Sequence, residues 1–437
     1  MRSPAELYAE HLRIVKGRCD KALAKGDCDH LLVASGIEKM RFLDDMPVPF
    51  KQNPQFKAWV PLIHHPHSWI AYTPGERPVL VYFQPDDYWH VPPSAPSGPW
   101  VEHFDIRVIA DPADAAKHLP AGGRRAILGE ADAALPGFEP NIPKAVLDSL
   151  HYHRAYKTGY ELDLMRRAQR KAARGHLAAR REFQAGGTEA SIHAAYMAAA
   201  GHTDFDLPYN NIVALNENGA TLHYQYKRFD APDGHRSLLI DAGAEVDGYA
   251  ADVTRTWGNG DAAFAGLVDA VDREQQALCA KVRAGTDYRD LHLECHLRLG
   301  GVLRDLGIVD MDPGTMLAEG VTSVFFPHGL GHPIGLQVHD VAGFVDEDGE
   351  LIPRPAGHPY LRMTRTLAPG MVVTIEPGLY FIPTLLKGLR EGKHAKAVDW
   401  KQVEHLAKFG GVRIEDEVHC TEGASENLTR DAFAEIA

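Results

Sequence analysis

The sequence predicts a two-domain protein of mixed α/β (α+β) class. Helical periodicities alternate along the chain with short apolar runs of strand length. At 437 residues the chain is too long for one ordinary hydrophobic core. The pattern changes after Tyr156, where short strands give way to a long helix rich in Arg and Ala. We therefore place the boundary near residue 157, with an N-terminal α/β domain (1–157) and a larger C-terminal domain (158–437).

The N-terminal domain should begin with a helix and continue with short strands. Ser3, Pro4 and Glu6 form a capping-box pattern, and apolar residues then recur at helical spacing until Gly26. Two further short helices are expected near residues 112–119 and 143–151. The predicted strands are HLLVAS from residue 30, FKAWVPL from 56, SWIAY from 68, RPVLVYF from 77, DIRVIA from 105 and RRAILG from 124.

The C-terminal domain should contain long helices and several more strands. Helices are expected over 161–183, from Thr188 onward, over 262–284 and over 287–306. The predicted strands are NNIVALN, ATLHYQY, TSVFFPHGLG, MVVTIEPGLY, GVRIEDEV and a hairpin at 238–256.

Composition excludes several classes of partner. The net charge of −13 argues against nucleic acid and anionic membranes, which bind basic surfaces. No run approaches the ~20 apolar residues that a membrane span requires. The five cysteines are odd in number and form no CxxC arrangement, which indicates a reducing compartment. We expect a cytoplasmic protein.

The hairpin stretch LLIDAGAEVDGYAADVTRT carries two aspartates, Asp241 and Asp252. Asp247-Gly248 between extended apolar runs is a strong hairpin signal. A four-residue loop would make the two aspartates direct cross-strand partners, and a two-residue turn would make them diagonal partners on the same face. In either register the paired carboxylates need a shared proton or a cation. Taken alone, two solvated turn residues are the simpler reading.

Three downstream stretches favour the metal. FPHGLGHPIGLQVHD holds His328, His332 and His339, and MVVTIEPGLY places Glu376 at the end of an apolar strand. Glu415 in GVRIEDEV interrupts another apolar run. Buried charges of this kind need a metal or an ion pair. Four carboxylates with one imidazole form a donor set that favours Mn²⁺ or Co²⁺, unlike the thiolate ligands of many zinc sites. Four carboxylates are also more than one ion needs, so two ions are implied.

The ordered blocks LIDAGAEVDGYAADVTRT, PHGLGHPIGLQVHD, TIEPGLY and GVRIEDE resemble the pita-bread metallopeptidases, which include methionine aminopeptidase, aminopeptidase P and prolidase. A separate N-terminal domain fits the last two groups. The stretch PYNNIVALNENGATLHYQY and the long insert 382–411 are most similar to bacterial Xaa-Pro dipeptidases of the PepQ type. That group includes the organophosphorus acid anhydrolases. The resemblance implies a creatinase-like N-terminal domain followed by a pita-bread catalytic domain.

The resemblance also implies roles for individual residues. Asp241 would bind one ion, Asp252 and Glu415 would bridge two, and His332 and Glu376 would complete the second. Glu376 would also move the proton. His339 and His223 would lie at the reacting carbonyl, with a hydrogen-bonded strand residue as the alternative for His223. Arg413 would bind the substrate carboxylate, or else only neutralise the acidic cluster. His328 would lie at the proline subsite, or else have a purely structural role. Subsite residues by resemblance, each of which could equally be core, are Tyr209, Leu222, Tyr288 and Val338. Asp45 is a hypothetical partner for the substrate ammonium.

The sequence leaves three candidate functions for the protein. The first is a homodimeric dipeptidase that uses two divalent ions, Mn²⁺ or else Co²⁺ or Zn²⁺, to split Xaa-Pro dipeptides, with organophosphate triester hydrolysis as a side activity. The second is an aminopeptidase P acting on longer Xaa-Pro peptides. The third is a non-catalytic peptide-binding protein of the same fold, which the complete ligand set argues against.

Overall fold

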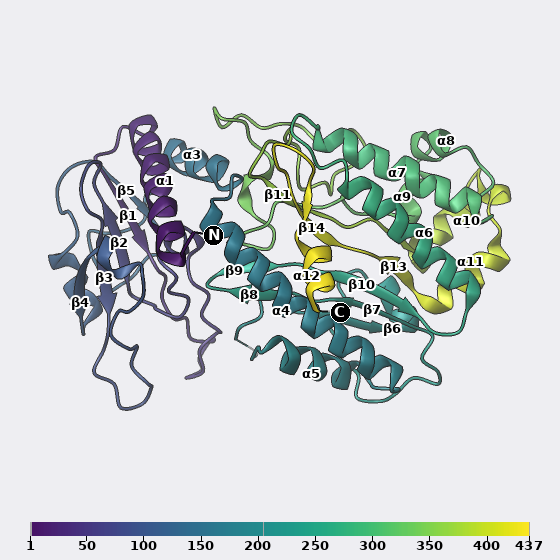
Figure 1. Cartoon of the computed structure of the whole chain (residues 1–437), viewed down its shortest axis with the longest axis horizontal. Helices are drawn as coiled ribbons and strands as arrows, with labels where there is room; N and C mark the ends of the chain where they lie inside the picture. The colour runs from purple at the N-terminus through teal and green to yellow at the C-terminus, as the bar shows by residue number, and fades with distance from the viewer. Residues whose placement is uncertain (1, 204, 437) are drawn as a thin grey trace. The chain divides into compact units, whose positions relative to one another are not determined.

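The computed structural model describes residues 2–203 and 205–436, which fold into two compact units (Figure 1). The N-terminal unit comprises Met1–Leu164 with the short segments Asp247–Tyr249 and Val345–Glu350. The C-terminal unit comprises Met165–Val246, Ala250–Phe344 and Leu351–Ala437. Both mix helices with sheets, so the predicted α/β (α+β) class is confirmed. Within the described residues, every helix is too short or too polar to cross a membrane.

The N-terminal unit is built on one mixed five-stranded sheet in the order β4-β3-β2-β1-β5. Its strands are β1 (His30–Ala34), β2 (Trp69–Tyr72), β3 (Val79–Phe83), β4 (Asp105–Ile109) and β5 (Arg125–Leu128). Its helices are α1 (Pro4–Lys25), α2 (Pro54–Lys57) and α3 (Lys144–Arg154). The pairs β1/β5 and β3/β4 are parallel, and the other two pairs are antiparallel.

Alternation along β1 explains why the sheet is buried on both faces. Leu31 and Val33 pack into the core that contains the buried face of α1, while Leu32 and Ala34 pack into a second core on the opposite face. Helix α1 begins with the predicted capping box: Ser3 Oγ accepts from the Glu6 backbone N–H, and the Glu6 carboxylate accepts from the Ser3 N–H. Five of the six strands predicted for this domain are confirmed.

The C-terminal unit contains several small sheets with helices packed around them. Its strands are β6 (Ile212–Leu215), β7 (Ser237–Asp241), β8 (Ala244–Val246), β9 (Tyr249–Ala251), β10 (Thr254–Gly258), β11 (Val372–Ile375), β12 (Gly378–Tyr380), β13 (Gly411–Arg413), β14 (Asp416–His419) and β15 (Glu426–Asn427). They pair in the orders β10-β7-β6, β11-β14-β15, β12-β13 and β8-β9.

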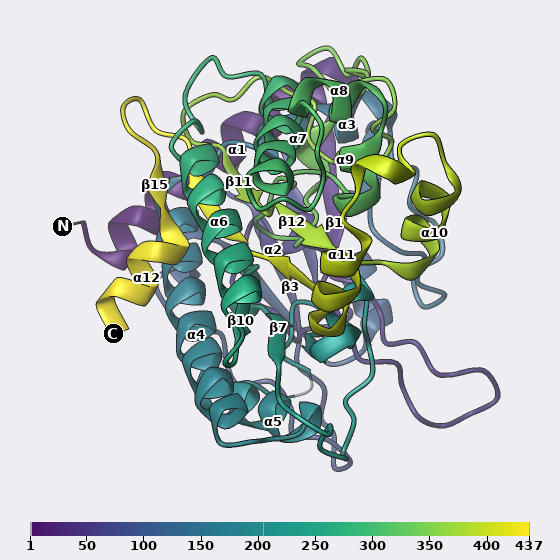
Figure 2. The ribbon, with the colours of Figure 1, turned by 90° about the vertical axis from the view of Figure 1, so that its right-hand side faces the viewer.

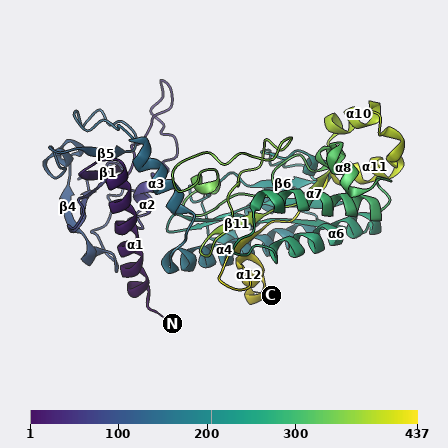
Figure 3. The same cartoon turned by 90° about the horizontal axis from the view of Figure 1, so that it is seen from above.

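The helices of this unit are α4 (Gly159–Gln184), α5 (Glu189–Ala200), α6 (Ala262–Cys279), α7 (Tyr288–Asp305), α8 (Pro313–Ala318), α9 (Val321–Phe325), α10 (Pro383–Glu391), α11 (Trp400–Leu406) and α12 (Leu428–Ile436). Helix α6 packs beside β10 (Figure 2), and α6 and α7 lie side by side (Figure 3). Helix α12 packs on β14. Strands β12 and β13 pair directly across the insert, which forms α10 and α11.

Three predicted strands are wrong. In FKAWVPL, Asn53 caps a short helix that starts at Pro54, so α2 replaces the strand. ATLHYQY forms no strand, because the buried Glu189 carboxylate binds the Tyr224 hydroxyl (2.8 Å) and neighbouring backbone, which holds the segment as an irregular loop. TSVFFPHGLG begins with α9, which follows Gly320 in the left-handed conformation. Periodicity cannot separate such short apolar runs from strands.

Candidate dinuclear metal centre

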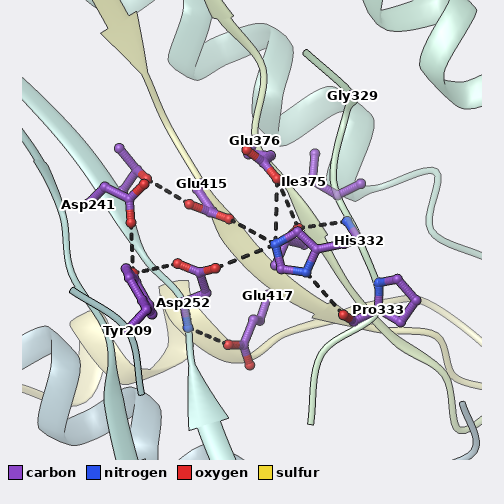
Figure 4. A network of polar contacts seen from close by, with 12 residues as sticks. Tyr209, Asp241, Asp252, Gly329, His332, Pro333, Ile375, Glu376, Glu415 and Glu417 are labelled. Carbon is purple, nitrogen blue, oxygen red and sulfur yellow. Dashed lines mark hydrogen bonds and ion pairs between the residues drawn. The ribbon is translucent and has the colours of Figure 1, made fainter. Parts of the chain in front are cut away.

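Four carboxylates reach one cavity because each stands at or beside a strand end. Asp241 ends β7, Asp252 follows β9, Glu376 follows β11, and Glu415 lies between β13 and β14 (Figure 4). The cavity has a volume of about 520 Å³. The sequence-predicted residues that line it are Leu222, His223, Asp241, Asp252, His328, His332, His339, Glu376, Arg413 and Glu415.

The hairpin register fixes the aspartate pair. Asp247 and Gly248 have φ angles of 49° and 88°, which suits a two-residue turn between β8 and β9. Asp241 pairs with Thr254 across β7 and β10, so Asp252 is its diagonal neighbour on the same face. The two-residue alternative is therefore confirmed, and the four-residue loop is wrong.

Tyr209 joins the two aspartates. Its hydroxyl oxygen lies 2.7 Å from Asp241 Oδ1 and 2.5 Å from Asp252 Oδ1. A hydroxyl carries one proton, so it can donate to only one of the two carboxylates at a time. Burial, together with the charge of Asp252, raises the pKa of Asp241. Further positive charge is needed at this pair.

His332 stands among the other donors. Its Nε2 lies 3.4 Å from Asp252 Oδ2, 3.6 Å from Glu376 Oε1 and 4.0 Å from Glu415 Oε1. Its Nδ1 is 3.0 Å from the Pro333 carbonyl oxygen, which places the proton on Nδ1 and leaves Nε2 free to bind a cation. The ligand atoms of Asp252, His332 and Glu415 all lie within 4.8 Å of one another.

The acidic cluster carries more negative charge than its protein partners balance. Burial and the neighbouring carboxylates raise the pKa of Glu415 well above its ordinary value, although the Thr254 hydroxyl donates to it at 2.6 Å. Burial raises the pKa of Glu376 to about 7. Carboxylates whose pKa values are raised in this way fit a site that binds divalent cations. Four oxygen donors with one imidazole nitrogen fit two such ions.

Arg413 binds the Asp241 carboxylate oxygen that Tyr209 does not contact. Its Nη2 donates to Asp241 Oδ2 (2.7 Å), its Nη1 to the Tyr380 hydroxyl (2.8 Å) and its Nε to Thr254 Oγ1 (3.3 Å). These contacts use three of the five guanidinium N–H groups and leave two. The contact with Asp241 supports the charge-neutralising role, and the two remaining groups can still bind a substrate.

Tyr380 connects Arg413 to the proline-subsite candidate His328. Because the Tyr380 oxygen accepts from Arg413, its proton is directed at His328 Nε2, 2.8 Å away. His328 Nδ1 faces the Gly329 carbonyl oxygen at 2.8 Å. Burial and the nearby guanidinium lower the pKa of His328 to about 3, so the ring is neutral at pH 7. Sequence reasoning missed Tyr380, because the pairing of β12 with β13 cannot be read from the sequence.

The other predicted residues occupy different environments. His339 and His223 line the cavity, and the His339 ring centroid is 4.3 Å from that of His332. Tyr288 is buried and donates to the Thr374 carbonyl oxygen at 2.7 Å. Tyr209, Tyr288 and Val338 do not line the cavity in the described residues. Asp45 lies in the N-terminal unit and is exposed.

Sequence reasoning also missed several cavity residues, among them Tyr360 and Arg362, and one buried carboxylate, Glu417. Tyr360 and Arg362 line the cavity from the segment that follows Leu351, and both are exposed. Glu417 Oε1 accepts from the Asp252 backbone N–H at 2.7 Å. Alternation from Glu415 along GVRIEDEV was a signal for Glu417, whereas nothing in the sequence marks the other two.

Both parts of the chain match known protein families. Residues 6–152 match the family described as Xaa-Pro dipeptidase, N-terminal domain, and residues 163–422 match metallopeptidase family M24. An Xaa-Pro dipeptidase of Xanthomonas campestris pv. campestris is 56% identical over 98% of both chains. One from Stenotrophomonas maltophilia is 54% identical over 99% of this chain and 98% of its own.

A solved structure shares the fold. Zinc-substituted aminopeptidase P of Escherichia coli in complex with product superposes with a TM-score of 0.72 at 24% identity, covering 96% of this chain and 94% of its own. The pita-bread architecture of the C-terminal unit is therefore confirmed, and the match to metallopeptidase family M24 supports a centre for divalent metal ions. On its full-length relatives and both matched domains, this chain belongs to the Xaa-Pro dipeptidases of metallopeptidase family M24.

Proposed function

We propose that the protein hydrolyses Xaa-Pro dipeptides and releases proline. The observation that carries this proposal is the gathering of five metal-type donors in one cavity that also holds two guanidinium groups, Arg413 and Arg362. An Xaa-Pro bond is a tertiary amide without an N–H, and a dipeptide also presents a free carboxylate. A cavity that combines divalent cations with guanidinium groups suits both features.

The donor set supports a specific division of ligands. Asp241 would hold one ion, His332 and Glu376 would hold the other, and Asp252 and Glu415 would be shared between them. Mn²⁺ is the proposed occupant because oxygen donors predominate, with Co²⁺ and Zn²⁺ as alternatives. When bound, the two ions supply Lewis-acid activation of water and of the scissile carbonyl.

The chain's own residues orient the substrate and move the proton. The Glu376 carboxylate, which lines the cavity with Oε2 3.8 Å from His328 Nδ1, accepts the proton of the attacking water and delivers it to the proline nitrogen. His339 and His223 donate to the oxygens of the tetrahedral carbon. The remaining N–H groups of Arg413 bind the substrate carboxylate. Arg362, which is exposed in the cavity, offers a second positive charge for that carboxylate.

Comparing a dipeptide with a longer peptide tests the proposal. The value of kcat/KM for Ala-Pro should exceed that for Ala-Pro-Ala-Ala by at least roughly a hundredfold, because the carboxylate that sets the register lies in the wrong place in the tetrapeptide. The measurement is proline release against release of the first residue. Faster cleavage of the tetrapeptide would support the aminopeptidase P alternative. No cleavage of either, with both ions bound, would support the non-catalytic alternative.

Metal removal gives a second expected result. Exhaustive chelation should lower Ala-Pro turnover by roughly a hundredfold or more, and Mn²⁺ should restore it, because the water and the carbonyl lose their activation together. Ala-Pro turnover by the same chelated protein refilled with Co²⁺ or Zn²⁺ ranks the metals by the activity they support. A phosphotriester assayed in parallel tests the side activity. Full turnover in protein shown by elemental analysis to be metal-free would refute the proposal.

The N-terminal domain, residues 1–157, is proposed to mediate a cytoplasmic homodimer and to wall the substrate pocket. Exposed apolar residues support an interaction role: Phe42 is 92% and Leu43 90% exposed beside Asp45, and Tyr88 and Trp89 are also exposed. Surfaces of this kind are covered more often in an assembly than left in water. Binding of the dipeptide ammonium by Asp45 stays a prediction.

A further inference from the structure

Three histidines gather away from the five donors described above. His292 and His296 lie one turn apart on α7, and His358 lies in the segment 351–362, which we call the cavity loop. The ring centroids are 4.8 Å apart for His292 and His296, and 4.7 Å for each of them and His358. One nitrogen from each ring lies within 4.8 Å of the other two. All three residues belong to the C-terminal unit.

Two of the ring nitrogens in this histidine triad have no hydrogen-bond partner. His292 and His296 are each only 1% exposed, yet His292 Nδ1 and His296 Nε2 are unpaired. Buried polar atoms in native proteins are rarely left this way, because each costs roughly 1–3 kcal/mol. Burial and the neighbouring rings lower the pKa of His292 to about 2, and burial lowers that of His296 to about 3. Each neutral ring has one lone pair, and a cation that replaced the 2.9 Å hydrogen bond between His292 Nε2 and His358 Nδ1 would release the lone pair used there.

We propose that the histidine triad binds one further divalent cation, zinc, separate from the dinuclear centre. Histidines at i and i+4 present their rings on one face of a helix, which is a common arrangement for binding zinc. The Thr322 hydroxyl contacts His296 Nδ1 at 2.9 Å and can fix the tautomer that frees Nε2. In a tetrahedral zinc site the ligand nitrogens are about 3.3 Å apart. The three nitrogens of the triad lie within 4.8 Å of one another, so small rotations of the rings would bring them to the spacing that zinc needs.

The donor types separate the two sites chemically. The dinuclear centre offers four carboxylates, whereas the triad offers only imidazole nitrogens. Imidazole suits zinc, and carboxylate oxygen suits manganese. Three imidazoles also leave a fourth position for water or an anion. A single equivalent of zinc added to the Mn²⁺-loaded protein should therefore bind at the triad first.

The position of the triad links a bound cation to the cavity. His358 is half-buried between the exposed Gly357 and Pro359, which gives a route from solvent. The same loop carries Tyr360 and Arg362 into the cavity. Phe326 packs between the triad and the cavity, with its ring 4.9 Å from His296 and 4.7 Å from His328. A cation held by His358 and α7 would thus anchor the cavity loop.

Zinc stoichiometry tests the site. Untagged full-length protein is first freed of metal by chelation, then equilibrated with a small excess of zinc, desalted, and measured by elemental analysis. We expect three zinc ions per chain in the wild type and two in His296→Gln and His358→Asn. His90→Asn, which alters a histidine whose side chain is 82% exposed, should keep three. Two ions per chain in the wild type, or three in both triad variants, would overturn the proposal.

Two measurements on the folded wild type do not depend on the variants. Anomalous diffraction at the zinc edge should show a peak between the three rings, and its absence from zinc-loaded crystals would overturn the site. Zinc added to the Mn²⁺-loaded protein should slow amide hydrogen exchange in the cavity loop severalfold. That protection should be lost in His296→Gln. Because neither readout involves turnover, failure here is distinguishable from failure of the proposed dipeptidase activity.

Discussion

Replacing Asp252 with asparagine is expected to lower kcat for Ala-Pro by roughly a thousandfold. Asp252 is the carboxylate that contacts both halves of the site: its Oδ1 is 2.5 Å from the Tyr209 hydroxyl and its Oδ2 is 3.4 Å from His332 Nε2. Asparagine has the same shape but removes the negative charge between the two proposed ions. Turnover and bound metal are measured on the same preparation.

The matched control for this variant is Asp261→Asn. Asp261 caps α6 by accepting from the Phe264 N–H at 2.8 Å, and asparagine caps helices about as well as aspartate. Its kcat should equal that of the wild type. Circular dichroism should show both variants folded, since Asp252 keeps its backbone bond to Glu417. Wild-type turnover in Asp252→Asn with both ions bound would exclude the bridging role.

Glu376→Gln is expected to lower kcat by roughly 10²–10⁴-fold, the usual contribution of a general acid–base group. Glu376 is the carboxylate that lines the cavity beside both His332 and His328. Glutamine keeps the size and an oxygen ligand but cannot carry a proton between water and the proline nitrogen. The value of KM should change less than kcat, because the carboxylate clamp stays in place. Steady-state kinetics with Ala-Pro measures both.

Glu417→Gln is the matched buried control. Burial raises the pKa of Glu417 to about 8, so its side chain is largely uncharged at pH 7 and glutamine is a close substitute. Its oxygen can still accept from the Asp252 N–H. We expect kcat within about threefold of the wild type. If Glu376→Gln behaved like Glu417→Gln, the proton-transfer role of Glu376 would be excluded.

The donors of the centre could be predicted because local chemistry marks them. Asp241 and Asp252 flank an Asp-Gly turn, and period-two alternation places them on one face whichever turn forms. Glu376 and Glu415 stand out because each interrupts an apolar run. Burial of a charge is costly, so such interruptions are kept only where something compensates them. The resemblance of the four blocks to the pita-bread metallopeptidases then predicted that these donors form one site.

The contacts around the donors could not be predicted, because they depend on pairing between distant segments. Tyr380 reaches Arg413 only through the pairing of β12 with β13, which are separated by residues 381–410. Arg362 reaches the cavity from a loop without regular structure. Similarly, His358 joins the α7 histidines across a long sequence separation. Three short apolar runs were misassigned because helix caps and a buried carboxylate outweighed their strand propensity.

Alternation around β14 has a consequence for how this chain can vary in length. Glu415 and Glu417 contact Thr254 and Asp252, while Asp416 points the other way and pairs with Arg255 and Arg430, each at 2.7 Å. A single inserted residue here would exchange the two faces of the strand. Asp416, which pairs with the two arginines, would then turn toward the cavity. Between α10 and α11, by contrast, the chain around residues 390–396 is mostly exposed and lies outside the cavity lining. Insertions and deletions among related chains should therefore collect around residues 390–396 and be absent from 411–419.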